Sequence, residues 1–232
     1  LFPYTTLFRS AGFFGAVIAE QAASRLGRSV CVLDRRPHIG GNAYSEVDSD
    51  SGVEVHRYGT HIFHTNSETV WRYMQRFTYF TDYRHRVFTV ANGRVYSMPI
   101  NLATVCAAFG RIMSPDEARA VIAAEAAAHG AGGIGNLEDK AIASVGRTLY
   151  DLLIRGYTQK QWQTDPRELS ADIIGRLPVR FSFDDRYFAD RYEGMPVDGY
   201  TAIFQRMLEH PKIAVELGVD YFDVAEIGRA HV

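Results

Sequence analysis

Residues 10–15 read Ser-Ala-Gly-Phe-Phe-Gly, and this stretch decides the fold. It is a degenerate form of the glycine-rich loop Gly-x-Gly-x-x-Gly, with Ser10 in the place of the first glycine. In such a loop the glycines let the backbone approach a pyrophosphate, and the following helix contributes N–H donors and the positive end of its dipole. The loop by itself is a weak signal, because short motifs of this kind also arise by chance.

The residues after the loop complete a βαβ pattern. Residues 12–26 carry apolar side chains at helical spacing and stop at Gly27, which predicts a helix. Residues 29–33 form a continuous apolar run ending at Asp34, as expected of a buried parallel strand. Asp34 follows Gly12 by 22 residues, close to the spacing of an acid that accepts hydrogen bonds from ribose hydroxyls. The alternative is a plain helix start and a strand-end acid that binds nothing.

A basic segment and a glycine pair follow Asp34. Residues 35–42 read Arg-Arg-Pro-His-Ile-Gly-Gly-Asn. A strand-end acid, a basic residue and then two glycines are typical of many FAD proteins, in which the glycine backbone approaches the cofactor. An ordinary glycine-rich turn is the alternative, but the position of Asp34 directly before this segment favours the FAD interpretation.

The rest of the chain alternates between strand and helix patterns. A βαβ unit requires a strand within residues 1–9, where the sequence is poor for one. Residues 86–98 predict a β-hairpin with an Asn-Gly turn. Residues 100–165 have a helical pattern, with a strong helix start at Ser114-Pro115. The later segments are predicted as a strand over 177–181, a helix over 200–208, and strands over 213–217 and 219–224.

Composition limits the classes of function. The chain has 232 residues, 47% of them hydrophobic, and a net charge of −2, which gives no global reason to bind nucleic acid or an anionic membrane. Its two cysteines, Cys31 and Cys106, make no disulfide framework, and no Cys/His cluster has zinc spacing. No apolar stretch is long enough to span a membrane, and the N-terminus does not resemble a signal peptide. We therefore expect a cytoplasmic protein.

Two motifs allow more than one interpretation. His61 and His64 stand three residues apart, where they would line a flavin ring or bind a metal, but no third ligand is near in sequence. Tyr157 and Trp162 lie in one helical segment, where they would stack on a base or pack into a core. On these residues alone the core interpretation is the better one.

Charged side chains follow the helical segment. Arginine is suited to bidentate phosphate binding, so Arg176 and Arg180 would contact an anionic ligand or lie in a solvated loop. Asp184 and Asp185 would offer carboxylates to Mg²⁺, but the neighbouring Arg186 favours ion pairs. We predict no metal site.

Taken together, these segments resemble the UDP-galactopyranose mutases, bacterial flavoenzymes of galactofuranose synthesis for the cell wall. Several of the shared motifs are peculiar to this family, and they occur in its order from about residue 11 to residue 224. The matching segments are residues 12–15, 34–44, 58–65, 96–102, 156–162, 176–181 and 194–201.

The resemblance implies an α/β fold. A Rossmann-like FAD-binding domain is interrupted by a helical bundle and an antiparallel β-sheet region. The expected bounds are 1–80 and 200–232 for the FAD-binding domain, 81–100 and 177–199 for the sheet region, and 101–176 for the helical substrate domain.

The resemblance also implies an activity. The family interconverts UDP-galactopyranose and UDP-galactofuranose without net redox change, using reduced FAD. The flavin N5 attacks the anomeric carbon and displaces UDP, and the sugar recloses from a covalent flavin adduct through a different hydroxyl. UDP-galactose is thus the expected partner, a homodimer is compatible with the resemblance, and neither nucleic acid nor membrane insertion is expected.

The family pattern carries over to individual positions. His64 would lie near the flavin face, and Arg176 would close onto the substrate diphosphate. In this context Trp162 belongs to the uridine side rather than to a core. The expected FAD contacts are Gly12, Phe14, Gly15, Asp34, Gly41, Asn42, Thr60, His61 and Val219. The expected substrate contacts are Leu153, Tyr157, Thr158, Trp162, Arg176 and Tyr187.

The sequence departs from the family in three places. Ser10 replaces a glycine, residues 1–9 do not resemble the first family strand, and the match stops at Ala225, while family members continue for more than a hundred residues. We therefore expect a truncated chain that binds FAD poorly and has little mutase activity. A redox flavoprotein of the amine-oxidase type, or a non-catalytic nucleotide-binding module, would share the glycine loop and Asp34, whereas the motifs around Trp162 and Arg176 favour the mutase.

Overall fold

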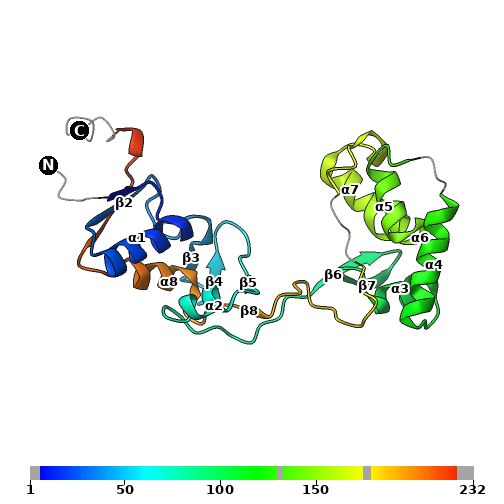
Figure 1. The fold of residues 1–232 in the computed structure, drawn as a ribbon, viewed down its shortest axis with the longest axis horizontal. Helices are drawn as coiled ribbons and strands as arrows, with labels where there is room; N and C mark the ends of the chain where they lie inside the picture. The colour runs from blue at the N-terminus through cyan, green and yellow to red at the C-terminus, as the bar shows by residue number, and fades with distance from the viewer. Residues whose placement is uncertain (1–5, 130–132, 175–178, 224–232) are drawn as a thin grey trace. The chain divides into compact units, whose positions relative to one another are not determined.

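The computed structural model describes residues 6–129, 133–174 and 179–223. The chain forms two compact units, one from Leu1–Tyr83 with Asp190–Val232 and the other from Arg84–Ala189. In Figure 1 the first unit joins the blue and cyan start of the chain to its orange end, while the second contains the green helices. Each unit has its own buried apolar core.

A parallel sheet of three strands organises the first unit. Its order is β1 (Thr6–Phe8), β2 (Val30–Asp34) and β9 (Ile213–Leu217). The central strand β2 pairs with both neighbours and is buried over its first four residues, which explains its continuous apolar sequence. Because the three strands are parallel, their carboxyl ends meet at one edge of the sheet.

Strand β1 corrects one expectation. The sequence before Ser10 is poor in strand signals, yet Thr6 pairs with Val30 and Phe8 with Val32. Pairing with a buried central strand stabilises a short edge strand in spite of weak local propensity. The first strand of the βαβ unit is therefore present, with three residues in the described part of the chain.

Two helices pack together in the first unit. α1 (Phe13–Leu26) is the predicted helix, and it ends where Gly27 adopts the left-handed conformation (φ 62°). Its buried face consists mainly of glycine and alanine, which lets neighbouring backbone come close. α8 (Gly199–Leu208) contacts α1 and contributes the large core side chains Tyr200 and Phe204.

Short elements connect the sheet to these helices. β3 pairs with β4, and β5 pairs with β8, in each case antiparallel. The elements are η1 (Gly41–Ala43), β3 (Ser45–Val47), β4 (Glu54–His56), β5 (Phe63–Thr65), α2 (Glu68–Met74) and β8 (Tyr192–Gly194).

The second unit is a hairpin packed on helices. β6 (Val87–Ala91) and β7 (Arg94–Met98) pair around Asn92 and Gly93, both with positive φ, so the predicted Asn-Gly turn is confirmed. The helices that follow are α3 (Leu102–Phe109), α4 (Pro115–Ala128), α5 (Leu137–Val145), α6 (Arg147–Leu149), the π-helical turn η2 (Tyr150–Ile154), α7 (Arg155–Trp162) and η3 (Pro166–Glu168).

Side-chain caps define where these helices begin. Ser114 accepts a hydrogen bond from the N–H of Glu117, while the carboxylate of Glu117 accepts one from the N–H of Ser114. This capping box confirms the helix start predicted at Ser114-Pro115. Asn136 caps α5 by accepting from the N–H of Asp139.

Two predicted strands are wrong. Of the strand expected over 177–181, residues 177 and 178 lie outside the described residues, and Arg180 makes only an isolated bridge with Asn101. Of the strand expected over 219–224, the described residues 219–223 form no strand. Gly218 turns the chain (φ 72°), and Asp220 accepts a hydrogen bond from the N–H of Phe222 at the start of a helical turn. In a short run, alternating apolar residues do not distinguish a strand from a turn or an isolated bridge.

The predicted α/β class is confirmed by the parallel sheet and its flanking helices. Among the described residues, no helix combines the length and the apolar character needed to cross a bilayer.

Candidate functional site

The glycine loop joins β1 to the N-terminus of α1. Gly12 precedes the helix without a side-chain cap, and its own N–H donates to Ser10 Oγ at 3.1 Å. A Cβ on Gly15 would lie 1.7 Å from the carbonyl oxygen of Ser10, so only glycine lets α1 pack this closely on the loop. Gly15 thus has the helix–strand packing role of the third glycine in a dinucleotide-binding loop.

A second glycine contact closes the loop from the other side. Gly41 has φ +57°, and a Cβ added there would lie 3.1 Å from Gly12 Cα. The N–H of Gly40 donates to the carbonyl of Ala11 at 2.8 Å, which joins the two glycine segments. The backbone of both segments is therefore accessible to a ligand without intervening side chains.

Asp34 ends β2 and orders the surrounding backbone. Its Oδ2 accepts from the N–H of Ala11 at 2.9 Å, and its Oδ1 accepts from the N–H of Arg36 at 3.0 Å. These two bonds hold the carboxylate in place. Each carboxylate oxygen has two acceptor sites, so Asp34 retains the capacity to accept from a hydroxyl.

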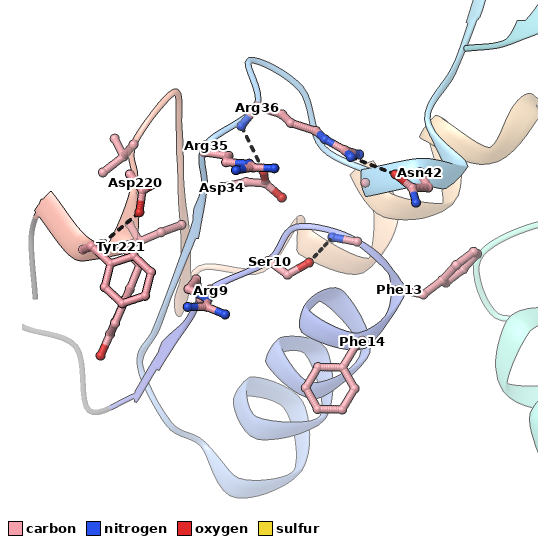
Figure 2. A pocket seen from close by; sticks show the side chains of 15 residues that line it. Arg9, Ser10, Phe13, Phe14, Asp34, Arg35, Arg36, Asn42, Asp220 and Tyr221 are labelled. Carbon is pink, nitrogen blue, oxygen red and sulfur yellow. Dashed lines mark hydrogen bonds between the residues drawn. The ribbon is translucent and has the colours of Figure 1, made fainter. Parts of the chain in front are cut away.

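A cavity of about 620 Å³ opens where the three parallel strands end. Loops after β1, β2 and β9 contribute to it, together with the start of α1, and Figure 2 shows these segments around the same space. Ligands of open α/β sheets bind outside the carboxyl ends of the strands. The lining consists of residues 9–10, 12–14, 33–36, 41–42 and 219–222.

Arginines give the cavity a positive charge. Arg9, Arg35 and Arg36 line it together with two aspartates, Asp34 and Asp220, so the lining has a formal net charge of +1. The guanidinium of Arg36 donates to Asn42 Oδ1 at 2.8 Å and lies 4.6 Å from the centre of the Tyr58 ring, so its position is set by two contacts. Figure 2 shows the bond between Arg36 and Asn42 at the rim. A cationic cavity beside a helix N-terminus suits a pyrophosphate.

The expected FAD contacts divide into two groups. Gly15, Thr60 and His61 are not in the cavity lining. Thr60 is exposed, and His61 donates its N–H to His56 Nδ1 at 3.0 Å while its ring meets Tyr200 edge-on. The expected contacts that line the cavity are Gly12, Phe14, Asp34, Gly41, Asn42 and Val219.

His64 forms a pair that the sequence did not indicate. Its Nδ1 lies 2.5 Å from Oδ2 of Asp190, which stands two residues before β8, the strand that pairs with β5. Asn66 Nδ2 donates to the other oxygen of Asp190. The separation of 126 residues between His64 and Asp190 explains why no motif joins them.

The expected substrate contacts lie in the second unit. Leu153 and Thr158 are buried, whereas Tyr157 is 68% exposed and Trp162 is 50% exposed. Exposure of both rings excludes the interpretation that α7 packs its aromatics into a core. Tyr157 and Thr158 lie in the first turn of α7, which follows the π-helical turn η2, a local distortion common at functional sites.

Two further expected substrate contacts lie beyond α7. Tyr187 is 45% exposed and meets His85 edge-on at 5.4 Å. Arg176 lies outside the described residues.

The acidic pair of the second unit forms ion pairs, as expected. Asp184 lies 2.9 Å from Arg186, whose hydrogen bond lowers the pKa of Asp184 to about 2. Asp185 lies 3.1 Å from Arg86. In the part of the chain that the structure describes, no group of three or more His, Cys, Asp or Glu side chains could hold a metal ion.

Comparison with known proteins agrees with this geometry. A family model described as UDP-galactopyranose mutase matches residues 152–231, and one described as an NAD(P)-binding Rossmann-like domain matches residues 11–77. The chain is 44% identical over 225 residues to the probable UDP-galactopyranose mutase of Klebsiella pneumoniae, a match that covers 96% of this chain. This chain is related to the UDP-galactopyranose mutases.

The relationship has a defined extent. The chain spans 57% of the Klebsiella pneumoniae mutase, so it covers little more than half the length of that relative. It is also 42% identical over 215 residues to the dTDP-fucopyranose mutase of Escherichia coli, covering 91% of this chain and 56% of that protein. A crystal structure of reduced UDP-galactopyranose mutase matches the fold with a TM-score of 0.63 at 17% identity, over 92% of this chain and 48% of that one.

Several residues of the first unit escaped sequence reasoning. Tyr221 and Phe222 line the cavity because β9 returns to the sheet, and the guanidinium of Arg9 lies 5.2 Å from the Phe222 ring. Asp190 was missed as the partner of His64. A strand predicted at 213–217 was the available signal for the first two, since the loop after a parallel strand faces the ligand edge.

Proposed function

We propose that this chain carries the FAD-binding and nucleotide-sugar-binding parts of a mutase that interconverts the pyranose and furanose forms of UDP-galactose. The observation that carries the proposal is the convergence of three strand ends and a glycine loop on one cationic cavity, in a chain related to these mutases. The first unit would hold FAD and the second would hold the nucleotide. Both cysteines are free, in keeping with the cytoplasmic setting that we propose.

The cavity residues fit the adenosine diphosphate half of FAD. The close approach of Gly12 and Gly41 supplies a side-chain-free cradle that a Cβ would fill. The start of α1, with Arg35 and Arg36, would hold the pyrophosphate. Asp34 would accept from a ribose hydroxyl, and Phe14, which is 75% exposed at the cavity, would cover the cofactor.

The second unit offers a surface for a pyrimidine nucleotide. Tyr157 and Trp162 expose their rings along α7, and aromatic side chains of this kind stack on nucleotide bases. Thr158 and Leu153 would pack behind these rings, since both are buried and lie within four residues of Tyr157 in the sequence. Tyr187 would contact the substrate, and Arg176 would neutralise its diphosphate.

The chemistry divides between cofactor and chain. Reduced FAD, when bound, supplies a nucleophilic nitrogen for the anomeric carbon of the sugar. Arg176 would stabilise the charge of the departing diphosphate, which makes the nucleotide a better leaving group. His64 would lie near the flavin face, where its imidazole ring would offer a hydrogen-bonding group.

The sugar nucleotide has a second candidate. The relative at 42% identity is named a dTDP-fucopyranose mutase, and dTDP-fucose is also a pyrimidine nucleoside diphosphate sugar. Stacking on Trp162 would accept either base. The furanose forms of UDP-galactose and of dTDP-fucose therefore both belong in the test. We expect UDP-galactofuranose to turn over faster, because the family model described as UDP-galactopyranose mutase matches residues 152–231.

Cofactor binding is tested by titrating FAD and measuring its fluorescence. The F14A variant should bind FAD about tenfold more weakly, because loss of an aromatic stacking surface costs about 1–3 kcal/mol. F183A is the matched control, since Phe183 is also exposed, at 67%, but belongs to the second unit. Equal affinity of F14A and wild type for FAD would count against the cavity as the FAD site.

Turnover is tested in a chimera that joins residues 1–223 to the remaining length of the Klebsiella pneumoniae mutase. After reduction with dithionite it should convert furanose to pyranose substrate, and the oxidised protein should not. Oxygen consumption with an amine substrate would instead indicate an oxidase. UDP binding without turnover would indicate a nucleotide-binding module.

A further inference from the structure

Two contacts hold the guanidinium of Arg36 at the cavity. Its Nη2 donates to Asn42 Oδ1 at 2.8 Å, the bond drawn in Figure 2, and its Cζ lies over the Tyr58 ring, 4.6 Å from the ring centre. Arg36 and Asn42 belong to the cavity lining, whereas Tyr58 does not. A guanidinium that lies over an aromatic ring keeps N–H groups directed away from the ring, and these can donate to a phosphate.

Hydrogen bonding holds the ring of Tyr58 in turn. His38 Nδ1 lies 2.9 Å from the carbonyl oxygen of Ile39, and a carbonyl can only accept, so this nitrogen carries a proton. In the neutral imidazole Nε2 is then an acceptor, and the hydroxyl of Tyr58 donates to it at 2.7 Å. The His38 ring also stacks on Tyr44 at a ring distance of 4.0 Å. Tyr58 is therefore held in place, although it is 46% exposed.

Strand pairing brings Tyr58 to this position. It stands two residues after β4, which pairs with β3, and the N–H of Arg57 extends the pairing by donating to the carbonyl of Tyr44 at 3.3 Å. The hydroxyl of Tyr44 donates to Glu46 at 2.6 Å. The two strands thus return an aromatic ring to the loop that follows β2, where it meets Arg36.

A guanidinium that is in place before a ligand arrives favours binding. A free arginine side chain populates many rotamers, and a phosphate that binds it confines the side chain to one of them, which lowers the affinity. A side chain already confined by Tyr58 and Asn42 avoids much of this loss. The ring of Tyr58 can therefore affect a ligand that it does not touch.

We propose that Tyr58 is a positioning residue that holds the guanidinium of Arg36 at the cavity for the diphosphate of a dinucleotide. Tyr58 acts through Arg36 and needs no contact with the ligand itself. The choice of a dinucleotide as the ligand rests on the proposed function, whereas the placement of Arg36 rests on the contacts of the ligand-free chain.

Removal of the ring tests the placement of Arg36 directly. Y58L lacks the ring, whereas Y58F keeps the ring and loses only the bond to His38. Y79L is the matched control, since Tyr79 is also exposed, at 81%, and belongs to the same unit. The ring current of Tyr58 should shift the ¹H NMR signals of the Arg36 CH₂ group beside the guanidinium upfield in wild type, Y58F and Y79L, and not in Y58L. R36M identifies these signals by their loss, and a folded wild type with unshifted signals would overturn the proposal.

Affinity for ADP, measured by NMR titration, tests the consequence for binding. Y58L should bind ADP about fivefold more weakly, because the ligand must then immobilise a long side chain, while Y58F and Y79L should stay close to wild type. R36M keeps an unbranched side chain without the guanidinium, so adding Y58L to R36M should change the ADP affinity no further.

Three results of the titration would refute positioning. Equal weakening by Y58L in the wild-type and R36M backgrounds would indicate a general structural effect. An ADP affinity that R36M leaves unchanged would remove Arg36 from the ligand site, as would a wild type that binds no ADP.

FAD binding separates this inference from the proposed function. It is measured in the chimera that joins residues 1–223 to the remaining length of the Klebsiella pneumoniae mutase. If Y58L weakens ADP binding through Arg36 while the chimera fails to bind FAD, positioning stands and the flavin assignment of the cavity is wrong. If the chimera binds FAD and R36M weakens that binding but Y58L does not, the function stands and the positioning role is wrong.

Discussion

Replacement of Gly15 by alanine tests the close packing that forms the glycine loop. An added Cβ would lie 1.7 Å from the carbonyl oxygen of Ser10 and 2.8 Å from its carbonyl carbon. An ordinary contact begins at 3.4 Å, so the distance to the oxygen is half of what is required. The obstacle is backbone of the loop after β1, which cannot rotate away as a side chain would. Helix α1 must therefore move outward.

The expected loss of stability follows from two opposing terms. Overpacking against backbone costs about 3 kcal/mol, the upper part of the usual range. Alanine offsets about 1 kcal/mol of this, because it is a better helix former than glycine. The net loss is about 2 kcal/mol, which would lower the urea midpoint by about 1 M for a protein of ordinary m-value.

The assay combines urea unfolding with hydrogen exchange of peptides from α1. G156A is the matched control, since Gly156 also lies in a helix, α7, but an added Cβ there meets nothing within 4 Å. We expect G156A to be as stable as wild type or up to about 1 kcal/mol more stable. A G15A variant that behaves like G156A, with unchanged exchange in α1, would refute the packing argument.

Three further variants probe other features. His56 has a lowered pKa, chiefly through burial and secondarily through His61, so the unfolded state takes up protons first. The first unit should lose stability as pH falls below about 6.5, and H56N should flatten this dependence in thermal melts. S114A should cost about 1 kcal/mol by removing the α4 cap, seen as faster amide exchange there and not in α1. E20A should cost about 1–3 kcal/mol, chiefly by leaving the partly buried hydroxyl of Tyr73 without its acceptor, and an unchanged melting temperature would contradict this.

Local structure was largely predictable from the sequence. The Asn-Gly turn of the hairpin and the Ser114-Pro115 helix start involve residues within a few positions of one another, and both form as expected. The apolar run 30–33, which ends at Asp34, forms the predicted buried strand. Where the local signal was ambiguous, as in 219–224, the prediction failed because a single glycine and an aspartate turned the chain.

By itself the sequence determined the glycine loop, the acid at the end of β2 and most helix boundaries, since short-range sterics and capping set them. Only the tertiary structure decided which distant segments share the cavity. Val219 joins Asp34 because β9 pairs with β2, and Asp190 reaches His64 because β8 pairs with β5. Pairing between segments far apart in the chain depends on burying the faces of whole elements together, and no short motif records that choice.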